Sequence, residues 1–409
     1  MDTLQPVSAS RLQAGFELAA EAGSGPTARL LFAGDLFAGG RAEAPLKDGA
    51  AHLLWGELME ETSQHDFCVA NLECPLTDTD APILKSGPAF RADPQCAQGI
   101  LAGGFDTVSM ANNHIRDMGD AGVVDTLAAC ERAGLRTVGA GRNLEDAAKT
   151  LFVTVNGLRV AILAIAENEF SVATESSAGA WPLDLADNFR QIRAAKEQAD
   201  LVLVIFHGGV EYYPLPTPAM TKTCRFFAEA GADGVICHHI HVPSGLEVHH
   251  GVPIVYGMGN FLFDRWPPEG NAGRSTGYMV SLDVRRGAVT KLQLIPYFQT
   301  QDECRARLMD ASAAAAFLTH IADLSATIAD KDALQREFDG LAASKRTQCL
   351  TSVLSLGRIE RRLLKTGVWP FWRTSPLQFA KLLNQFSCES HRELVLSVLR
   401  SEIVKRRSS

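Results

Sequence analysis

The chain has 409 residues, of which 46% are hydrophobic and 21% charged, as in a globular protein with an ample core. The net charge of −8 gives no reason to expect nucleic acid as a partner. Its nine cysteines are scattered without a C-x-x-C pair, which is typical of reduced thiols rather than a disulfide framework. The first residues do not resemble a signal peptide, and we see no apolar run of the roughly 18 residues that a spanning helix needs. We therefore expect a cytoplasmic protein without a transmembrane segment.

Apolar strands and helical segments alternate over residues 29–300. The all-apolar stretch Leu201–Phe206 predicts a strand that is covered on both faces. Asn156-Gly157 is a strong hairpin signal between two such strands. The alternation predicts an α/β protein, and the hairpins predict that its sheets are mixed. Strands are expected over 29–33, 67–70, 105–110, 135–138, 151–155, 158–166, 200–206, 235–237, 254–256, 278–284 and 289–296, and helices near 50–62, 122–133, 185–198 and 218–230.

The sequence changes character after about residue 300. Residues 310–344 are rich in Ala, Leu, Asp and Lys, with helical spacing and no strand signal. Residues 354–409 hold eleven Lys and Arg against four Asp and Glu, a net charge of +7, so the rest of the chain carries −15. We therefore divide the chain into a lead-in over 1–28, a main α/β domain over 29–300 and a basic helical appendage over 301–409.

The basic segment from Arg358 to Arg407 also carries two tryptophans and two prolines. A basic helix that bears Trp can rest on an anionic membrane surface, so peripheral membrane contact is one interpretation. The alternative is that the apolar faces of the appendage pack on the acidic core. Because Pro370 divides the segment, we favour a docked helical cap that overhangs the functional site of the main domain and restricts substrate size.

Two histidines follow the apolar strand that ends near Cys237. If this segment is extended, His239 and His241 point to the same side because side chains alternate along a strand. Two imidazoles on one side suit a borderline metal such as zinc, iron or manganese. The competing interpretation is a pair of hydrogen-bonded loop histidines.

Other polar residues also stand just past apolar strands, at the edge where open α/β sheets bind ligands. Two carboxylates, one amide and several imidazoles at five strand ends together predict a metal centre. They are Asp35, Glu73, Asn113 with His114, His207, and His239 with His241.

The motif order GD, NLE, NNH, HGG-x-E-Y, HH-x-H and Y-G-x-G-N-F resembles the bacterial capsule-synthesis family of poly-γ-glutamate proteins, the CapA type, among the calcineurin-like metallophosphoesterases. The resemblance extends from about Leu30 to Asp264. It implies a four-layer α-β-β-α sandwich with two mixed sheets and two divalent metal ions (Mn, Fe or Zn) at the strand ends. Residues 29–300 would then form the catalytic domain.

The resemblance also implies a role for each motif residue. Glu73 would bridge the two metals, Asp35 and His241 would complete one site, and the other site would use Asn113, His207 and His239. His114 would be the catalytic residue that binds no metal and meets the substrate or leaving group. Two such metals clamp a phosphoryl group and activate a water, and a nearby histidine can protonate the departing oxygen.

The sequence departs from this pattern at several points. Phe37 stands where calcineurin-like enzymes usually have a histidine, and Cys237 replaces the glycine before the histidine pair. We expect Cys237 to be a small buried thiol and His238 to be structural. His249-His250 lie in a polar turn and are expected to be solvated. We expect no counterpart here of the membrane anchor to which the family resemblance points.

Several residues near the motifs could contact an anionic substrate. Lys85 and Arg91 lie in the loop after the second strand, where cations are either solvated or directed at a substrate. Glu211 and Tyr212 follow His207 and could position a substrate or anchor their loop. The substrate-binding candidates are Lys85, Arg91, Asn112, Glu211 and Tyr212.

Three functions remain open from the sequence. The first is a metal-dependent hydrolase that acts on a phosphoester or a related anionic small molecule or polymer, in surface-polymer or secondary metabolism. The second uses the same metal site on a γ-glutamyl or peptide amide, as a hydrolase or transferase. The third is a non-enzymatic accessory subunit of polymer biosynthesis. The sequence leaves the oligomeric state open.

Overall fold

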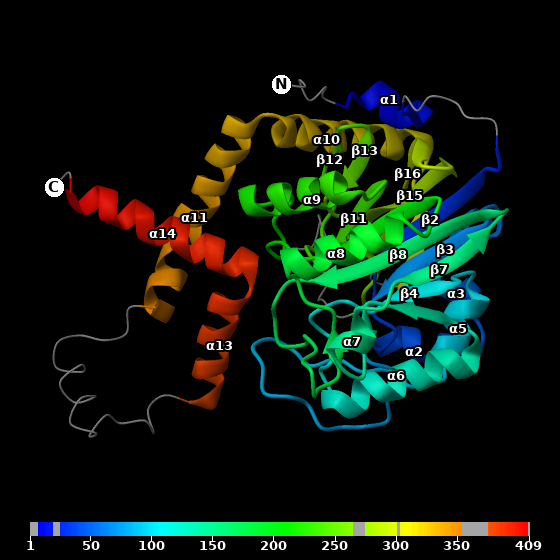
Figure 1. The fold of residues 1–409 in the computed structure, drawn as a ribbon, viewed down its shortest axis with the longest axis horizontal. Coiled ribbons are helices and arrows are strands. Elements are labelled where there is room, and N and C mark those ends of the chain that lie inside the picture. Colours follow the sequence, from blue (N-terminus) through cyan, green and yellow to red (C-terminus); the bar gives the residue numbers. More distant parts are fainter. Residues whose placement is uncertain (1–6, 19–24, 265–274, 301–302, 354–374, 408–409) are drawn as a thin grey trace.

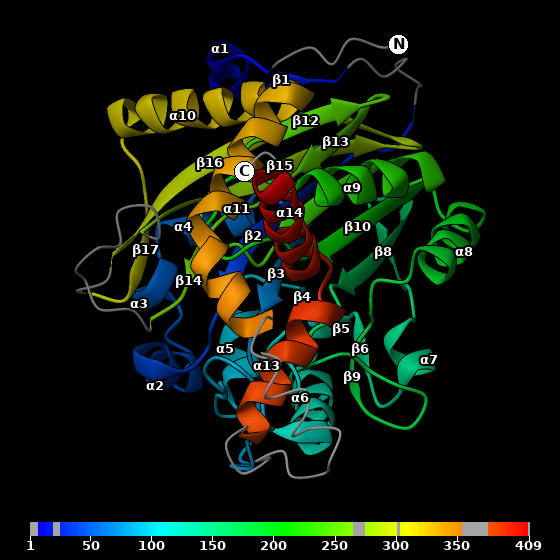
Figure 2. The ribbon, with the colours of Figure 1, turned by 90° about the vertical axis from the view of Figure 1, so that its left-hand side faces the viewer.

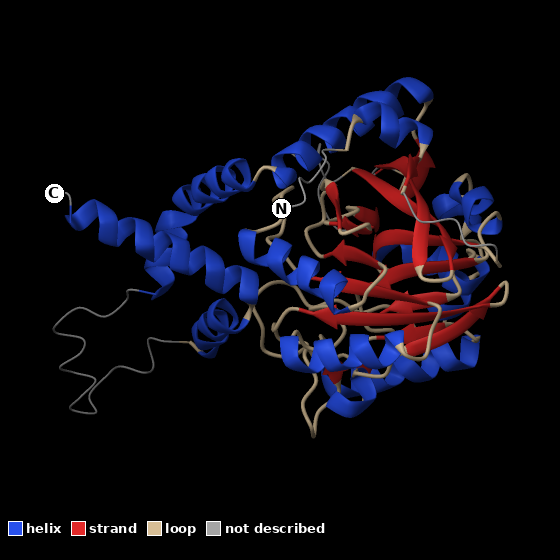
Figure 3. Cartoon of the chain, turned by 45° about the horizontal axis from the view of Figure 1, so that its top comes forward, coloured by secondary structure: helices blue, strands red, loops and turns tan. Residues whose placement is uncertain are grey.

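The computed structural model describes residues 7–18, 25–264, 275–300, 303–353 and 375–407. Two β-sheets stack in the middle of the molecule, helices cover their outer faces, and further C-terminal helices lie at one end (Figures 1 and 3). This is the four-layer α/β arrangement with mixed sheets that the sequence predicted, with its C-terminal helical appendage.

The larger sheet has nine strands, of which β2, β3, β4 and β5 are parallel neighbours, while the hairpin β15–β16 adds antiparallel strands. Its order is β1 (Phe16–Glu17), β16 (Ala288–Thr300), β15 (Thr276–Arg285), β2 (Ala28–Leu36), β3 (Phe67–Leu72), β4 (Thr107–Ser109) and β5 (Arg136–Val138), with β14 (Asn260–Leu262) beside β2 and β17 (Arg305–Leu308) beside β16.

The smaller sheet has six strands in the order β12 (Leu246–His249), β13 (Val252–Val255), β11 (Gly234–His238), β10 (Leu201–His207), β8 (Leu158–Ala166) and β7 (Leu151–Val155). Strands β13, β11, β10 and β8 are parallel, and the two outer strands are antiparallel. Every residue of β10 is buried, and its side chains alternate between the core between the sheets and the core under the helices. A strand covered on both faces is why this stretch is apolar throughout. A small third sheet pairs β6 (Ala140–Gly141) with β9 (Gly179–Ala180).

Helices complete the two outer layers. Over the smaller sheet lie α8 (Leu185–Lys196) and α9 (Pro218–Ala230), which contact β10 and β11 (Figure 1). Both start where the sequence supplies a cap: Asp184 accepts backbone N–H groups of α8, and Thr217 does so for α9, followed by a proline. The larger sheet is flanked by α2 (Glu43–Lys47), α3 (His52–Trp55), α4 (Leu58–Ser63), α5 (Cys96–Ala102) and α6 (Gly119–Ala133), and α7 (Leu144–Ala147) adjoins the small sheet.

The structure differs from the prediction at both ends of the main domain. Part of the lead-in forms α1 (Ala9–Ala14) and β1, in which Phe16 pairs with Leu292. After residue 300 the larger sheet continues as β17, so the predicted boundary falls inside a β-hairpin. The edge strand β12 was also not predicted. Short edge strands are specified by backbone pairing with a neighbour, and their sequences need no apolar run.

The C-terminal part of the chain is helical in the residues described. It forms α10 (Ala311–Ala329), α11 (Lys331–Val353), α13 (Pro376–Ser387) and α14 (Glu389–Arg407). Helix α10 packs against β12 and β16, and α14 contacts α11 and α9 (Figure 2). The basic, tryptophan-bearing segment 358–373 lies outside the described residues.

Helix α10 is long and apolar enough to cross a membrane by length and composition, and it alone passes that test among the residues described. A third of its most apolar window is buried, and Leu318 and Ile321 belong to the hydrophobic core that includes residues of both sheets. His320 and Asp323 interrupt the apolar residues of this helix, so it contains no continuous apolar run of about 18 residues.

The corner between α13 and α14 docks on residues 167–169, which directly follow β8. Ser390 Oγ donates to Glu167 Oε1 (2.6 Å), and Cys388 Sγ lies 3.2 Å from Glu167 Oε2. The Glu389 carboxylate accepts from the backbone N–H of Asn168 (3.0 Å) and from its side-chain amide (2.9 Å). These contacts place the C-terminal helix pair at the carboxyl edge of the smaller sheet.

Burial raises the pKa of Glu167 to about 8, and the charge of Glu389 also raises it. Hydrogen bonds from Ser390 and Cys388 lower it, but they do not outweigh the burial. Below the ordinary carboxyl pKa of 4.5, both folded and unfolded chains hold this proton. Between pH 4.5 and about 8 only the folded chain holds it, so this group makes folding less favourable as the pH rises.

We therefore predict that Glu167→Gln, which keeps the shape but cannot ionise, reduces the fall in thermal stability between pH 5 and about 8. Thermal unfolding at constant ionic strength over this range measures the effect. The exposed Glu175→Gln serves as the matched control and should follow the wild-type profile. Identical profiles for Glu167→Gln and wild type would contradict the prediction.

Candidate metal centre

Polar side chains from both sheets meet at one edge of the sandwich. Because β2, β3 and β4 are parallel, and so are β10 and β11, each sheet has these carboxyl ends at one edge. The two edges adjoin, since Glu73 lies 3.7 Å from His207 and 3.5 Å from His241. Each of these side chains belongs to a residue that is at most 7% exposed. The residues are Asp35, Glu73, Asn113 and His114 from the larger sheet, and His207, His239 and His241 from the smaller one.

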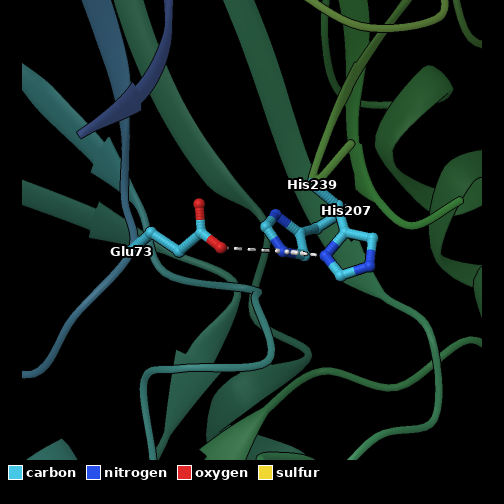
Figure 4. A group of neighbouring side chains, drawn as sticks. All are labelled: Glu73, His207 and His239. Carbon is cyan, nitrogen blue, oxygen red and sulfur yellow. Dashed lines mark hydrogen bonds and ion pairs between the residues drawn. The ribbon is translucent and has the colours of Figure 1, made fainter. Parts of the chain in front are cut away.

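The structure places five of these residues in two groups that share Glu73. One contains Glu73, His207 and His239, and the other contains Asp35, Glu73 and His241; in each, the possible ligand atoms lie within 4.8 Å of one another. Glu73 Oε1 is 3.7 Å from His207 Nε2 and 3.5 Å from His241 Nε2. In Figure 4 the Glu73 carboxylate extends from one sheet toward the two imidazoles of the other. The resemblance to the capsule family implied the same division.

Asn113 belongs beside the first group, because its Oδ1 lies 3.1 Å from His207 Nε2. The Glu73 carboxylate is fully buried, and neither oxygen has a hydrogen-bond partner in the described part of the chain. Burial raises the pKa of Glu73 well above its usual value, and the charge of Asp35 raises it further. An unpaired buried carboxylate costs free energy, so these residues fit a cation that the chain does not itself supply.

The histidines are also suited to bind a cation. Burial lowers the pKa of His207 well below its usual value, and the neighbouring imidazole of His239 adds to this. Burial likewise lowers the pKa of His239 to about 4. Neutral imidazoles with carboxylate and amide oxygens are the donors that manganese, iron and zinc accept. The donor set therefore fits divalent metal ions.

The residues beside the two groups hold the candidate ligands in place. Asn71 Nδ2 donates to Asp35 Oδ1 (2.9 Å), and His238 Nδ1 lies 3.0 Å from the same oxygen. Burial raises the pKa of Asp35, but the hydrogen bond and charge of His238 outweigh it, so the pKa lies below its usual value. Asn260 Oδ1 lies 2.9 Å from His241 Nδ1. Sequence reasoning quoted Asn71 and Asn260 within motifs without giving them this role.

The backbone near the histidines is not extended, which corrects the reason given for their convergence. Strand β11 ends at His238, and both His239 (φ 96°) and His241 (φ 59°) lie in the left-handed region. Their rings are 6.2 Å apart and serve different groups. Such strained positions for residues with a Cβ persist where the surroundings enforce them, often at functional sites.

A close backbone contact explains the glycine of the GD motif. A Cβ on Gly34 would lie 2.0 Å from the carbonyl oxygen of Gly259, which also accepts from Asp35 N at 3.2 Å. Only glycine allows this approach. The first and last motifs of the sequence therefore meet here and set the position of Asp35.

His114 lies in a buried polar cluster with Asp117 and Lys85. His114 Nδ1 is 2.6 Å from Asp117 Oδ2, and Lys85 Nζ is 2.5 Å from Asp117 Oδ1 and 3.1 Å from the carbonyl of Asn113. Burial lowers the pKa of His114, and the charge of Lys85 lowers it further. Lys85 is only 7% exposed, so its ammonium is directed at this cluster rather than at solvent. Asp117 was missed, although an acid three residues after the histidine was a readable signal.

Two of the substrate-binding candidates lie elsewhere. Asn112 is fully buried; its amide donates to the carbonyl of Leu72 (2.8 Å), and its oxygen accepts from His114 N. Its polar atoms are thus used in holding the loop, so the structure corrects Asn112 from a substrate contact to a positioning residue. Arg91 has an exposed side chain 3.7 Å from Asp80, and the structure does not bring it into the cluster.

The other candidates flank the second group. The ring of Tyr212 stacks on His241 with centroids 5.6 Å apart, and Glu211 beside it is exposed. Phe37, which stands where a histidine is usual, packs against Phe90 (4.9 Å) and Phe263 (5.4 Å). Aromatic packing of Phe37 therefore occupies the position where the metal-binding histidine is usual.

Two further sequence features lie away from this edge. Cys237 is buried with its sulfur 3.6 Å from that of Cys224, as expected for a small core thiol. His249 Nε2 lies 2.9 Å from Glu229 Oε1, and with His250 these residues form a third, partly exposed group of ligand-type side chains.

The fold and the site define an α/β sandwich protein with buried donors for divalent metals at the carboxyl edges of both sheets. The family model of the bacterial capsule synthesis protein PGA_cap matches residues 29–265. The chain belongs to this family.

Curated relatives show the same affiliation. The chain is 30% identical over 240 residues to the capsule biosynthesis protein CapA of Bacillus anthracis, a match that covers 56% of this chain and 57% of that protein. It is also 30% identical over 264 residues to a probable polyglutamine synthesis accessory protein of Mycobacterium tuberculosis, covering 59% of this chain and 69% of that one. The chain thus spans little more than half the length of the Bacillus anthracis relative.

Solved structures offer a more distant likeness. The structure of a 5'-nucleotidase precursor from Thermus thermophilus matches 74% of this chain and 58% of that one, with 14% identity and a TM-score of 0.39.

We predict that the purified protein carries between one and two equivalents of manganese, iron or zinc, and that Glu73→Ala or His239→Ala loses most of it. Glu73 is common to both groups, and His239 supplies an imidazole to one. Elemental analysis of protein purified without chelator measures this, with His250→Ala as a control for the distant third group. Wild-type protein that takes up no metal even after reconstitution would contradict the prediction.

Proposed function

We propose that the protein is a metal-dependent hydrolase of an anionic substrate, a phosphoester or a related group, in the making or processing of a surface polymer. The observation that carries the proposal is the Glu73 carboxylate, which is buried, without a donor from the described chain, and shared by two imidazole-bearing groups. Asp35 and His241 would hold one ion, and Asn113, His207 and His239 the other. Divalent ions bound there would supply Lewis acidity and a water of lowered pKa.

The remaining residues would orient the substrate and move its proton. Asp117 engages His114 at Nδ1, which leaves Nε2 to exchange a proton with the leaving-group oxygen. The lowered pKa of His114 makes its protonated form a stronger acid, and the Lys85 charge supports this. Phe90, with its ring 4.2 Å from that of His114, helps to exclude water, which strengthens electrostatic interactions.

A second candidate uses the same residues on an amide. One relative is named a PGA biosynthesis protein, and another is named a probable polyglutamine synthesis accessory protein. A γ-glutamyl amide also develops a negative oxygen during hydrolysis, which the same cations would stabilise.

The two candidates are separated by one substrate screen on metal-loaded protein. Phosphomonoesters and phosphodiesters are compared with γ-glutamyl amides and poly-γ-glutamate, with Glu73→Ala protein as the blank. Phosphoester turnover supports the first candidate, and amide turnover alone supports the second. If loaded wild-type protein turns over neither, the hydrolase proposal fails and a non-enzymatic accessory role takes its place.

His114→Ala should keep its metal and its fold but lose about 10²–10⁴-fold in the rate of hydrolysis, the usual contribution of a positioned general acid. Metal content and turnover are measured on the same preparations. The control His250→Ala should retain wild-type turnover, because its group lies apart from the centre. Loss of metal from His114→Ala would instead make His114 a ligand.

A further inference from the structure

The imidazole of His239 turns its two nitrogens to different surroundings. Nδ1 lies 3.1 Å from His207 Nε2, on the side of the group that contains Glu73. Nε2 is buried and has no hydrogen-bond partner among the described residues, and it lies 3.6 Å from Glu169 Oε1. When Nδ1 binds a cation, the proton of the neutral ring must sit on Nε2. A buried N–H then needs an acceptor, and the Glu169 carboxylate is at hand.

Glu169 is in turn held from the C-terminal helices. Its second oxygen, Oε2, accepts from Asn384 Nδ2 of α13 at 3.2 Å. The Glu169 side chain is 8% exposed and Asn384 is 7% exposed, so the contact is largely shielded from solvent. Asn384 Nδ2 also lies 3.2 Å from His391 Nδ1 of α14. The carboxylate is thus fixed between an imidazole of the candidate centre and the corner of α13 and α14.

The segment that carries Glu169 is anchored at every residue. Glu167 accepts from Ser390, Asn168 is held by Glu389, and Glu169 is held by Asn384. The backbone of Glu167 also donates to the carbonyl of His207, so this segment lies directly beside the end of β10. All the anchoring side chains belong to residues 384–390, which lie beyond the 29–265 matched by the family model.

We propose that Glu169 is a positioning residue for His239, and that Asn384 makes metal binding at this centre depend on the C-terminal helix pair. The carboxylate accepts a hydrogen bond from the Nε2–H group of His239. This fixes the tautomer in which Nδ1 is free to bind the metal, and it increases the basicity of the ring. Carboxylates that support a metal-bound histidine in this way affect metal affinity by about 10–100-fold. This inference rests on the proposed function in one respect, that the centre binds a divalent metal.

The test is a calorimetric titration of the chelator-stripped full-length protein with Mn²⁺ and with Zn²⁺. Glu169→Ala should weaken binding by about 10–100-fold. Glu169→Gln keeps an acceptor without the charge and should recover part of the loss. Asn384→Ala should weaken binding less than Glu169→Ala, because the carboxylate remains but is less well oriented. Exposed Glu175→Ala, in the same loop region, and exposed Lys381→Ala, on the same helix as Asn384, are matched controls that should bind as wild type.

A second readout separates positioning from folding. In ¹⁵N-histidine spectra of the metal-free protein, wild type should hold His239 mainly with the proton on Nε2, and Glu169→Ala should shift the ring toward a mixture of tautomers. Thermal unfolding of the metal-free variants checks that each one is folded. If Glu169→Ala is not folded, Glu169→Gln takes its place in both measurements.

The outcomes distinguish this inference from the proposed function. If wild type binds metal and both Glu169→Ala and Glu169→Gln bind it with unchanged affinity, the inference is overturned and the proposed function stands. Weakened Glu169→Ala with unchanged Asn384→Ala overturns the link to the C-terminal helices. Wild type that binds neither metal removes the proposed function, and this inference with it.

Discussion

The arrangement of the site depends on one buried carboxylate. Glu73 lies at the end of β3 with no exposed surface and with no hydrogen-bond donor for either oxygen in the described chain. Its neighbours include another carboxylate, Asp35, and the imidazole of His207, whose own burial disfavours its protonated form. A buried carboxylate without a hydrogen-bond donor is unfavourable by itself, so these surroundings favour the binding of a positive charge. That electrostatic requirement underlies the assignment of the centre.

The two stacked sheets provide the geometry that this requirement needs. The carboxylates and the amide come from the larger sheet, and the three candidate imidazole ligands come from the smaller one. Apolar side chains from both sheets, such as Leu31 and Ile205, belong to one continuous hydrophobic core. Close packing of that core sets the spacing of the two edges, so Glu73 can lie 3.7 Å from His207 although 134 residues separate them in the chain. The position of the polar site therefore depends on the packing of the hydrophobic core.

The C-terminal helix pair α13–α14 attaches at this same edge, where it makes several polar contacts. Glu389 and Glu393 accept backbone N–H groups of Asn168 and Ala219, and Ser390 reaches the buried Glu167. Buried polar contacts of this kind specify one docking geometry, because each group left unpaired would cost free energy. The family model ends at residue 265, so the helix pair lies outside the segment by which the chain belongs to the family.

The sequence by itself determined the α/β class, the mixed sheets and the grouping of polar residues at strand ends, because apolar runs and their punctuation are local signals. It also pointed to Glu73, His207 and His241, which the motif order marks. Only the tertiary structure decided that Lys85 is buried against Asp117, that Asn112 is buried with hydrogen bonds from both of its side-chain polar atoms, and which ring nitrogen of His239 faces the centre. These facts depend on contacts between residues far apart in the chain and on backbone angles that local patterns do not encode. The pairing of Glu169 with Asn384 joins positions 215 residues apart, and packing alone brings them together.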